Sequence, residues 1–456
     1  MEFGDFPPRG SGVPGRKEGA PSAVWAHPWQ LGPSWDWAPG KLLLGKWKGR
    51  LIGRDDDRHF MTIAGSGAGK TSSVLINNLR RYPGSCIVLD PKGELARATA
   101  DHRRALGQKV FVLDPFNEVT ANSACHNPLD ELGQGRDEHI PADAAQFCEG
   151  LIMNYAKDPH WSNASRSFTK GAILHLMSTS PRVTMRDVRR LMHGTPVELD
   201  KLFTDMTDSS AFNGIVANIG ASFLGKKESG GRELQSILST AQTQTDPLDD
   251  ILHITERSEF KLSDLSKGKM TIYLVLPGMR MATHYPWLRV VIQQALNALE
   301  RSPVPRGQLP VWFVLEEFSA LGHMRSVEMA AGLMRSFGVK LWPVIQDLSQ
   351  LKTAYPKSWQ TFVCNAGLLQ CFGNVGETSE FLSKLLGDTM VFERQDVRVA
   401  GQAMAHGDDG RREHIRSVPL LAPTEVTQHF SRESGRQLVL MPGRPPIYLE
   451  RLAIDE

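Results

Sequence analysis

The sequence predicts an α/β fold: a mostly parallel sheet flanked by helices, with an all-helical domain inserted into it. Short apolar runs alternate with helical patterns from residue 41 to 135 and again from 225 to 456, whereas residues 136–224 show helical spacing alone. Strands separated by helices of about 10–15 residues are typical of βαβ units and hence of parallel sheets. The chain of 456 residues is long enough for two or three domains.

Each predicted strand is a short, mostly apolar run, and each predicted helix has apolar residues at helical spacing. The strands are residues 60–64, 86–89, 110–113, 270–276, 311–315, 339–345, 368–372, 437–441 and 446–449. The helices of the α/β part are 70–81, 93–106, 286–300 and 324–337, and those of the insertion are 144–153, 165–177, 185–192, 196–203 and 210–219. The glycine-rich run 225–231 is expected to be a flexible hinge.

Residues 1–40 are rich in proline and glycine and carry Trp25, Trp29, Trp35 and Trp37. This composition predicts an extended arm without a core of its own. Tryptophans in such an arm attach it to its own protein more often than they bind a partner.

The stretch Ala64-Gly65-Ser66-Gly67-Ala68-Gly69-Lys70-Thr71 lies between a predicted strand and a predicted helix. In that order, a glycine-rich loop turns its backbone N–H groups toward phosphate, and the helix N-terminus adds partial positive charge. Lys70 is expected to reach the β- and γ-phosphates and Thr71 to hold Mg²⁺, which makes ATP and Mg²⁺ the predicted cofactors. Ala64 stands where the strict pattern has glycine, and ordinary φ and ψ angles suffice there.

Two carboxylates, Glu316 and Glu317, directly follow the predicted strand 311–315. Ligands bind at the carboxyl ends of parallel strands. We assign Glu316 to the metal ion and Glu317 to the attacking water. Gln346 follows the strand 339–345, and Arg335 lies near the end of a helix. Spacing alone favours an ordinary surface residue at each of these two positions. The alternatives are a γ-phosphate sensor for Gln346 and an arginine finger acting in trans for Arg335.

Several motifs in one order resemble the TraG-type coupling ATPases of type IV secretion and conjugation, over residues 41–450. They are AGSGAGKT (64–71), VLDPKGE (88–94), VFVLDPFN (110–117), NPLDELG (127–133), WSNASRSFTKGAILHLM (161–177), VWFVLEEFSALGHM (311–324), LWPVIQDLSQLK (341–352), WQTFVCNAG (359–367) and SKLLGD (383–388).

The resemblance implies a RecA/FtsK-like P-loop nucleotide-binding domain, formed by residues 41–135 and 225–456, with an inserted all-α domain at 136–224. It implies an ATPase that works as a hexamer and transfers DNA–relaxase complexes or effector proteins into a type IV secretion channel. Sequence-nonspecific DNA and inner-membrane components of the channel are its implied partners. By position, Lys70 and Thr71 match the phosphate-loop residues, Glu316 and Glu317 the metal and water acids, Gln346 the strand-end glutamine and Arg335 the finger.

Such ATPases typically begin with two transmembrane helices, whereas this sequence has no run of about 20 apolar residues. We therefore expect a cytoplasmic chain that lies at the bacterial inner membrane through a partner, with residues 1–40 as the docking element. Two alternatives remain open: a soluble FtsK/HerA-like DNA translocase, and a docking adaptor that does not hydrolyse ATP. Lys70, Thr71 and Glu317 argue against the adaptor.

Composition excludes other classes. The net charge of +2 gives no strongly basic excess, so DNA contact would depend on local clusters. The five cysteines include no C-x-x-C pair, and no His/Cys spacing predicts zinc. The basic run Arg182, Arg186, Arg189 and Arg190 favours a solvated helix face over a DNA contact.

Overall fold

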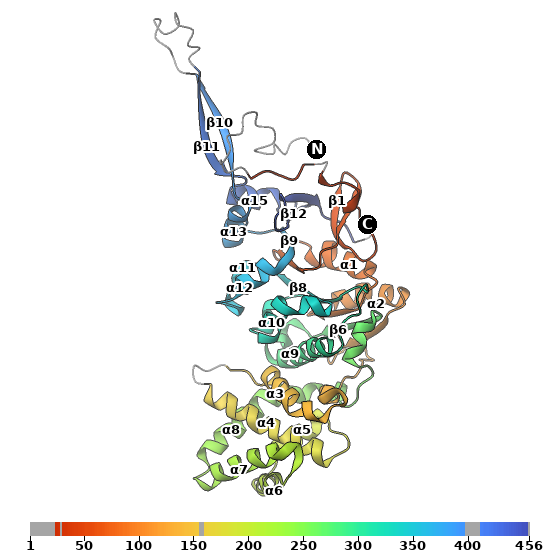
Figure 1. The fold of residues 1–456 in the computed structure, drawn as a ribbon, viewed down its shortest axis with the longest axis vertical. Coiled ribbons are helices and arrows are strands. Elements are labelled where there is room, and N and C mark those ends of the chain that lie inside the picture. The colour runs from red at the N-terminus through yellow and green to blue at the C-terminus, as the bar shows by residue number, and fades with distance from the viewer. Residues whose placement is uncertain (1–22, 28–29, 155–158, 397–410, 455–456) are drawn as a thin grey trace, which may run out of the picture. The chain divides into compact units, whose positions relative to one another are not determined.

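The computed structural model describes residues 23–27, 30–154, 159–396 and 411–454 (Figure 1). The chain divides into two compact units. The first unit consists of the residues up to Asn78 and from Val344 onward, and the second unit is Leu79–Pro343. Each unit contains sheet strands with helices packed on them, and strand β8 (Val339–Ile345) contributes to both.

The sheet of the first unit has the strand order β2-β1-β13-β12-β9-β3-β8. Strand β3 pairs in parallel with β8 and β9, and the other pairs are antiparallel. Its strands are β1 (Leu42–Trp47), β2 (Arg50–Arg54), β3 (His59–Ala64), β9 (Ala366–Phe372), β12 (Arg436–Leu440) and β13 (Ile447–Glu450), with a separate hairpin of β10 (Asp388–Asp396) and β11 (Arg411–Pro419). Its helices are η3 (Pro33–Trp35), η4 (Lys70–Leu75) leading into α1 (Ile76–Arg81), α11 (Leu348–Ala354), α12 (Trp359–Asn365), α13 (Glu377–Leu386) and α15 (Pro423–His429).

The sheet of the second unit is entirely parallel, in the order β8-β7-β4-β6-β5. Its strands are β4 (Cys86–Asp90), β5 (Lys109–Leu113), β6 (Met270–Val275) and β7 (Val311–Leu315). Strands β4, β6 and β7 are buried at every position, as expected where helices cover both faces of a parallel sheet. The helices near this sheet are α2 (Glu94–Ala105), η10 (Leu262–Lys267), α9 (Gly278–Arg301), η11 (Phe318–Leu321), α10 (Arg325–Leu333) and η12 (Met334–Phe337).

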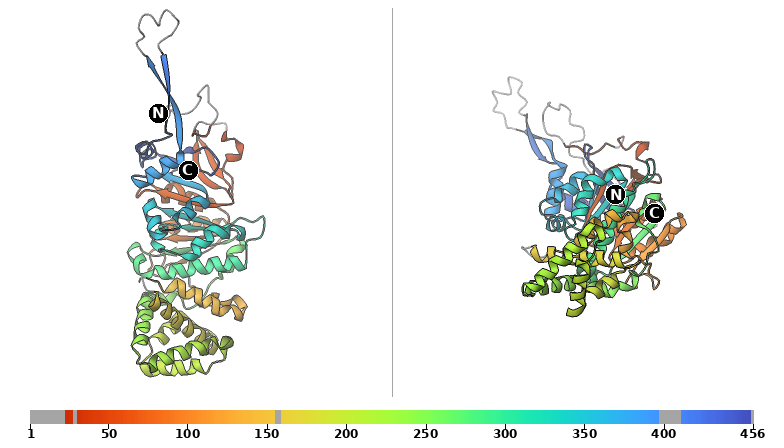
Figure 2. Two further views of the ribbon diagram at one scale, coloured as in Figure 1. Left: turned by 60° about the vertical axis from the view of Figure 1, so that its left-hand side comes forward. Right: turned by 60° about the horizontal axis from the view of Figure 1, so that its bottom comes forward.

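Helices and the turns between them make up the described residues from Ile140 to Ile254, whose colour runs from orange through yellow to green in Figure 2. They are α3 (Ile140–Leu151), α4 (His160–Thr179), α5 (Met185–Met192), α6 (Pro196–Thr207), η8 (Ala211–Gly214), α7 (Ile215–Glu228), α8 (Arg232–Thr245) and η9 (Asp246–Ile254). Short 3₁₀ turns precede them: η5 (Pro128–Glu131), η6 (Gly133–Gly135) and η7 (Asp137–His139). Capping boxes begin two of the helices, because Thr184 and Thr195 each exchange hydrogen bonds with the acid three residues later.

The predicted fold class is confirmed: a mostly parallel sheet flanked by helices, with a helix-rich segment between its strands. The hinge prediction for 225–231 is wrong in extent, because α7 continues to Glu228 and α8 starts at Arg232. Only a short turn remains, in which Gly230 and Gly231 both have positive φ angles. The domain boundaries at 135 and 224 stay predictions.

Two arm tryptophans are buried in the first unit. Trp25 packs edge-on against Tyr448, with ring centroids 5.4 Å apart, and also contacts Phe430. Trp35 is buried beside Arg54. These two side chains attach the arm to its own protein, so they are not available as membrane or partner anchors. Trp29 lies outside the described residues.

Replacing Trp25 by alanine should therefore destabilise the protein by about 3–5 kcal/mol, the usual cost of removing a buried large aromatic side chain. Chemical denaturation would measure the change. Trp161→Ala is the control, because Trp161 is 38% exposed and should change the free energy of unfolding far less. Equal effects of the two substitutions would show that the Trp25 contacts do not stabilise the unit.

Candidate active site

The phosphate loop lies in the first unit, between β3 and the helix that begins at Lys70. Strand β3 is buried along its whole length, so the loop starts from a fixed point. Gly65 packs closely on the end of β9: a Cβ at Gly65 would lie 2.1 Å from the carbonyl oxygen of Gly373. The Gly65 N–H also donates to the carbonyl of Phe372 at 3.2 Å. Only glycine fits this position, because any side chain would collide with the backbone of Gly373, directly after β9.

Two further glycines shape the loop. Gly67 and Gly69 have φ angles of +65° and +92°, in the left-handed region that glycine adopts without strain. The Ala68 N–H donates to the Gly65 carbonyl at 3.1 Å and closes the turn. Among the described residues, the N–H groups of Gly67 and Gly69 have no protein acceptor. N–H groups left open in a glycine turn are suited to phosphate oxygens, so this loop fits a phosphate group.

The helix after the loop starts as a π-helix over Lys70–Leu75. Single π turns are rare and are frequently found at functional sites. The hydroxyl groups of Ser72 and Ser73 both donate to the carbonyl oxygen of Gly69, at 3.2 and 2.7 Å. These bonds fix the start of the helix directly behind the loop. Lys70 and Thr71, the predicted phosphate and Mg²⁺ residues, are both half-buried there.

A buried amide holds this helix on the sheet. The Asn78 side chain accepts from the Leu43 N–H at 2.7 Å and donates to the Leu43 carbonyl at 2.9 Å. It thereby pairs with the backbone of β1 as another strand would. The position of the helix relative to the sheet is consequently fixed within the first unit.

Gln346 follows β8 at the same sheet edge as the phosphate loop. The register of the parallel pair places Ile345 beside Ile63, one residue before the loop begins. Gln346 is half-buried, and its N–H donates to the Gln350 side chain at 3.1 Å. A strand-end amide beside a phosphate loop is well placed for the predicted γ-phosphate sensor, a role that stays a prediction.

The two predicted acids lie at the end of β7 in the second unit. Glu316 is buried, with 7% of its surface exposed, and Glu317 is half-buried. Glu317 has a φ angle of +52°, a left-handed conformation that is uncommon for any residue other than glycine. Such backbone outliers are concentrated at active sites. The catalytic role of Glu317 stays a prediction, and its left-handed backbone could not be inferred from the sequence.

Arg335 lies in η12 of the second unit, and its side chain is exposed. Met329 and Leu333, on the preceding helix α10, are 52% and 62% exposed. These three side chains are exposed on consecutive elements, and the trans-acting role of Arg335 stays a prediction. The structure thus groups Gln346 with the phosphate loop in the first unit, and Glu316 and Glu317 with Arg335 in the second unit.

Asp90, which the sequence analysis did not assign, lies at the end of β4 in the second unit. Strand β4 pairs in parallel with β7, and Leu89 is in register with Leu315. Asp90 and Glu316 therefore follow paired positions at one sheet edge. The Oδ2 atom of Asp90 accepts from the Ala96 N–H at 2.7 Å, whereas Oδ1 is buried without a partner. Burial raises the pKa of Asp90 to about 6. The sequence signal that could have identified Asp90 is an acidic residue at the end of an apolar strand.

Three of the four arginines in the basic run, Arg182, Arg186 and Arg190, are exposed, in line with the predicted solvated helix face, and Arg189 is the exception. Arg189 is buried and forms ion pairs with Asp246 and Asp249, at 2.9 and 2.7 Å. The hydrogen bond from Arg189 lowers the pKa of Asp249. Arg186 pairs with Glu256 at 2.5 Å. Helical periodicity could not indicate these contacts, because the acids come from η9 and the turn after it.

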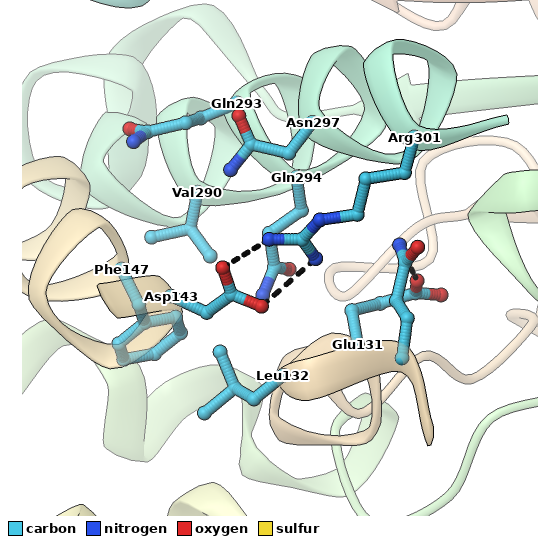
Figure 3. Close-up of a pocket in the computed structure, with 10 residues that line it drawn as sticks. Glu131, Leu132, Asp143, Phe147, Val290, Gln293, Gln294, Asn297 and Arg301 are labelled. Carbon is cyan, nitrogen blue, oxygen red and sulfur yellow. Dashed lines mark hydrogen bonds and ion pairs between the residues drawn. The ribbon is translucent and has the colours of Figure 1, made fainter. Parts of the chain in front are cut away.

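A small cavity in the second unit lies between α9 and the η5–α3 segment (Figure 3). The Arg301 guanidinium crosses it and donates to both oxygens of Asp143, a bidentate pair that joins α9 to α3. Its volume of about 10 Å³ accommodates a water molecule at most. This cavity is therefore a packing feature of the helices and no nucleotide site.

The fold and the phosphate loop define a P-loop α/β protein. Residues 33–454 match the family model described as type IV secretory system conjugative DNA transfer, and the chain belongs to this family. The chain is 26% identical to the conjugal transfer protein TraG of Agrobacterium fabrum over 97% of its own length and 67% of that protein. It is also 26% identical to protein VirD4 of Agrobacterium fabrum, over 91% of its length and 61% of that protein.

A solved structure of the bacterial conjugative coupling protein TrwB has the same fold. Its TM-score is 0.71 at 15% identity, and the match covers 99% of this chain and 96% of that one. TrwB has also been solved with ADPNP, a non-hydrolysable ATP analogue, and with ADP and Mg²⁺. The chain spans about two thirds of the length of the curated relatives it matches. In the part of the chain that the structure describes, no helix combines the length and hydropathy needed to cross a membrane.

Proposed function

We propose that this protein is an ATP-hydrolysing coupling protein that recruits DNA–relaxase complexes or effector proteins to a type IV secretion channel and drives their transfer. The observation that carries the proposal is the glycine-shaped phosphate loop, which precedes Lys70 and Thr71 in a member of the conjugative DNA transfer family. The TrwB complexes with ADPNP and with ADP and Mg²⁺ support ATP and Mg²⁺ as the ligands.

In this proposal Lys70 binds the β- and γ-phosphates, and Thr71 and Glu316 bind Mg²⁺, which neutralises charge that develops during phosphoryl transfer. Glu317 orients and polarises the attacking water. Gln346 senses the γ-phosphate at the edge of β8, and Arg335 completes the active site of a neighbouring copy. The working assembly is a hexamer located at the inner membrane through secretion-channel partners.

Plasmid transfer from the native host tests the coupling role. Deleting the gene should abolish transfer, the wild-type chain should restore it, and Lys70→Ala should not. Purified protein would be assayed for ATP hydrolysis in parallel. Hydrolysis without any effect on transfer would favour the soluble DNA translocase, and transfer supported fully by Lys70→Ala would favour the non-hydrolysing adaptor.

DNA should stimulate ATP hydrolysis in a sequence-independent, salt-sensitive manner. The net charge of +2 leaves only local basic clusters to contact DNA phosphates, and a ring would gather several copies of each cluster around one channel. Stimulation should be present at low salt and fall steeply between roughly 50 and 200 mM, because DNA binding releases counterions. The ATPase rate would be measured with and without unrelated DNA sequences. Lack of stimulation at every salt concentration would favour protein effectors as the substrate.

A further inference from the structure

Arg451, just after β13, contacts the phosphate loop within the first unit. Its guanidinium donates to the carbonyl oxygen of Ala68 in the loop. The same guanidinium donates to the carbonyl oxygens of Ser431 (3.3 Å) and Arg432. One side chain thus joins the loop to the segment that follows α15. Arginine is suited to this role because its planar fork directs several donors at once.

The surroundings of Arg451 hold it in place. Its guanidinium carbon lies 4.8 Å from the ring centroid of Phe372, at the end of β9, and its backbone N–H donates to the Gly435 carbonyl at 2.7 Å. The side chain is half-buried, and burial lowers the pKa of Arg451, although Glu433 acts in the opposite direction. A partly desolvated guanidinium held on both sides fixes the distance between the loop and the segment 431–435.

That segment carries a second arginine over the loop. The Nη1 atom of Arg432 lies 3.1 Å from the position that a Cβ of Gly67 would occupy, and its guanidinium carbon lies 3.6 Å away. The Arg432 side chain is exposed, and among the described residues it pairs with no carboxylate. Gly67 is also one of the loop residues whose N–H groups have no protein acceptor in the described part of the chain. An exposed guanidinium and the Gly67 backbone, whose N–H has no protein acceptor among the described residues, therefore lie side by side.

We propose that Arg432 binds the phosphates of the nucleotide in the same chain, and that Arg451 is the positioning residue that holds Arg432 and the phosphate loop together. This inference rests on the proposed function, since it assumes that the loop binds a nucleotide. The ligand chemistry is a polyphosphate chain, whose oxygens accept the forked donors of arginine. Arg432 supplies a positive charge in addition to that of Lys70, from a segment more than 300 residues further along the chain.

Titration calorimetry with ADP and with a non-hydrolysable ATP analogue, both with Mg²⁺, tests the role of Arg432 on the full chain. Arg432→Gln should weaken binding of the ATP analogue about tenfold or more, the usual effect of losing a charge-assisted hydrogen bond. Arg432→Lys should recover part of that loss because it keeps the charge. Arg444→Gln is the matched control, since Arg444 is an exposed arginine of the same unit that lies near Trp35.

Arg451→Lys tests the positioning role, because a single ammonium group cannot donate to the loop and to the 431–432 carbonyls together. It should weaken binding of the analogue, and adding Arg432→Gln should weaken it little further. If the losses of affinity caused by Arg451→Lys and Arg432→Gln multiply in the double variant, Arg451 does not act through Arg432 and the positioning role is wrong. This holds even if Arg451→Lys also lowers the melting temperature.

If the wild-type chain binds the analogue, Lys70→Ala does not, and Arg432→Gln binds like the wild type, Arg432 has no phosphate contact and the inference fails while the proposed function stands. If the wild-type chain binds neither nucleotide, the proposed function itself is wrong.

Discussion

Glu317→Gln should bind ATP normally and hydrolyse it about 10²–10⁴ times more slowly than the wild type. This is the range expected for loss of a general base. Glutamine keeps the size of the side chain and the left-handed backbone of Glu317, but it cannot accept the proton of the attacking water. Nucleotide binding would be measured by calorimetry, and turnover by phosphate release at saturating ATP. The separation of binding from turnover is the diagnostic result.

Two variants complete this experiment. Lys70→Ala should lower both affinity and turnover, because it removes a charge that contacts the phosphates before and during the reaction. Glu300→Gln should behave as the wild type, since Glu300 is an exposed acid at the end of α9. Turnover by Glu317→Gln at the wild-type rate would exclude Glu317 as the acid that activates water.

Mixing Arg335→Ala chains with Glu317→Gln chains should restore part of the ATPase activity that each variant lacks alone. An arginine finger contributes on the order of 10³–10⁵ in rate, and in a mixed ring some interfaces would combine an intact Arg335 with an intact Glu317. Arg335 is exposed, and a side chain that acts on a neighbouring copy must be exposed on its own chain. The ATPase rate would be followed as a function of the mixing ratio and of total protein concentration.

Arg325→Ala provides the control, because Arg325 is an exposed arginine at the start of the neighbouring helix α10. It should neither lose activity nor complement Glu317→Gln. Full activity of the Arg335→Ala protein alone, or of the wild type at dilutions where only monomer remains, would exclude a finger acting in trans.

The sequence by itself determined the α/β class and the strands that lie around the candidate site. The runs 60–64, 86–89 and 311–315 are recognisable because strands buried on both faces are almost entirely apolar, a local property of the sequence. The phosphate loop is equally local, since strand, glycines and helix are consecutive. The alternation of these elements was sufficient to predict a mostly parallel sheet.

The sequence did not reveal β1, β2 or the β10–β11 hairpin, nor that residues 232–245 form α8. Strands β2, β10 and β11 have mixed polar and apolar positions, and the apolar run of β1, residues 42–44, is only three residues long, so their pairing depends on neighbouring strands. The helix α8 follows two glycines that were interpreted as part of a hinge, although the glycines confine the turn to Gly230 and Gly231.

Only the tertiary structure decided how the phosphate loop is held. Gly65 needs to be glycine because Gly373 approaches it, and Ala68 is bonded by Arg451, a residue nearly 400 positions later in the chain. The left-handed backbone of Glu317 and the burial of Arg189 likewise depend on packing. Local patterns specify which element forms, because they act between neighbouring residues. Contacts between distant segments depend on how the sheet brings strand ends together, and no local pattern contains that information.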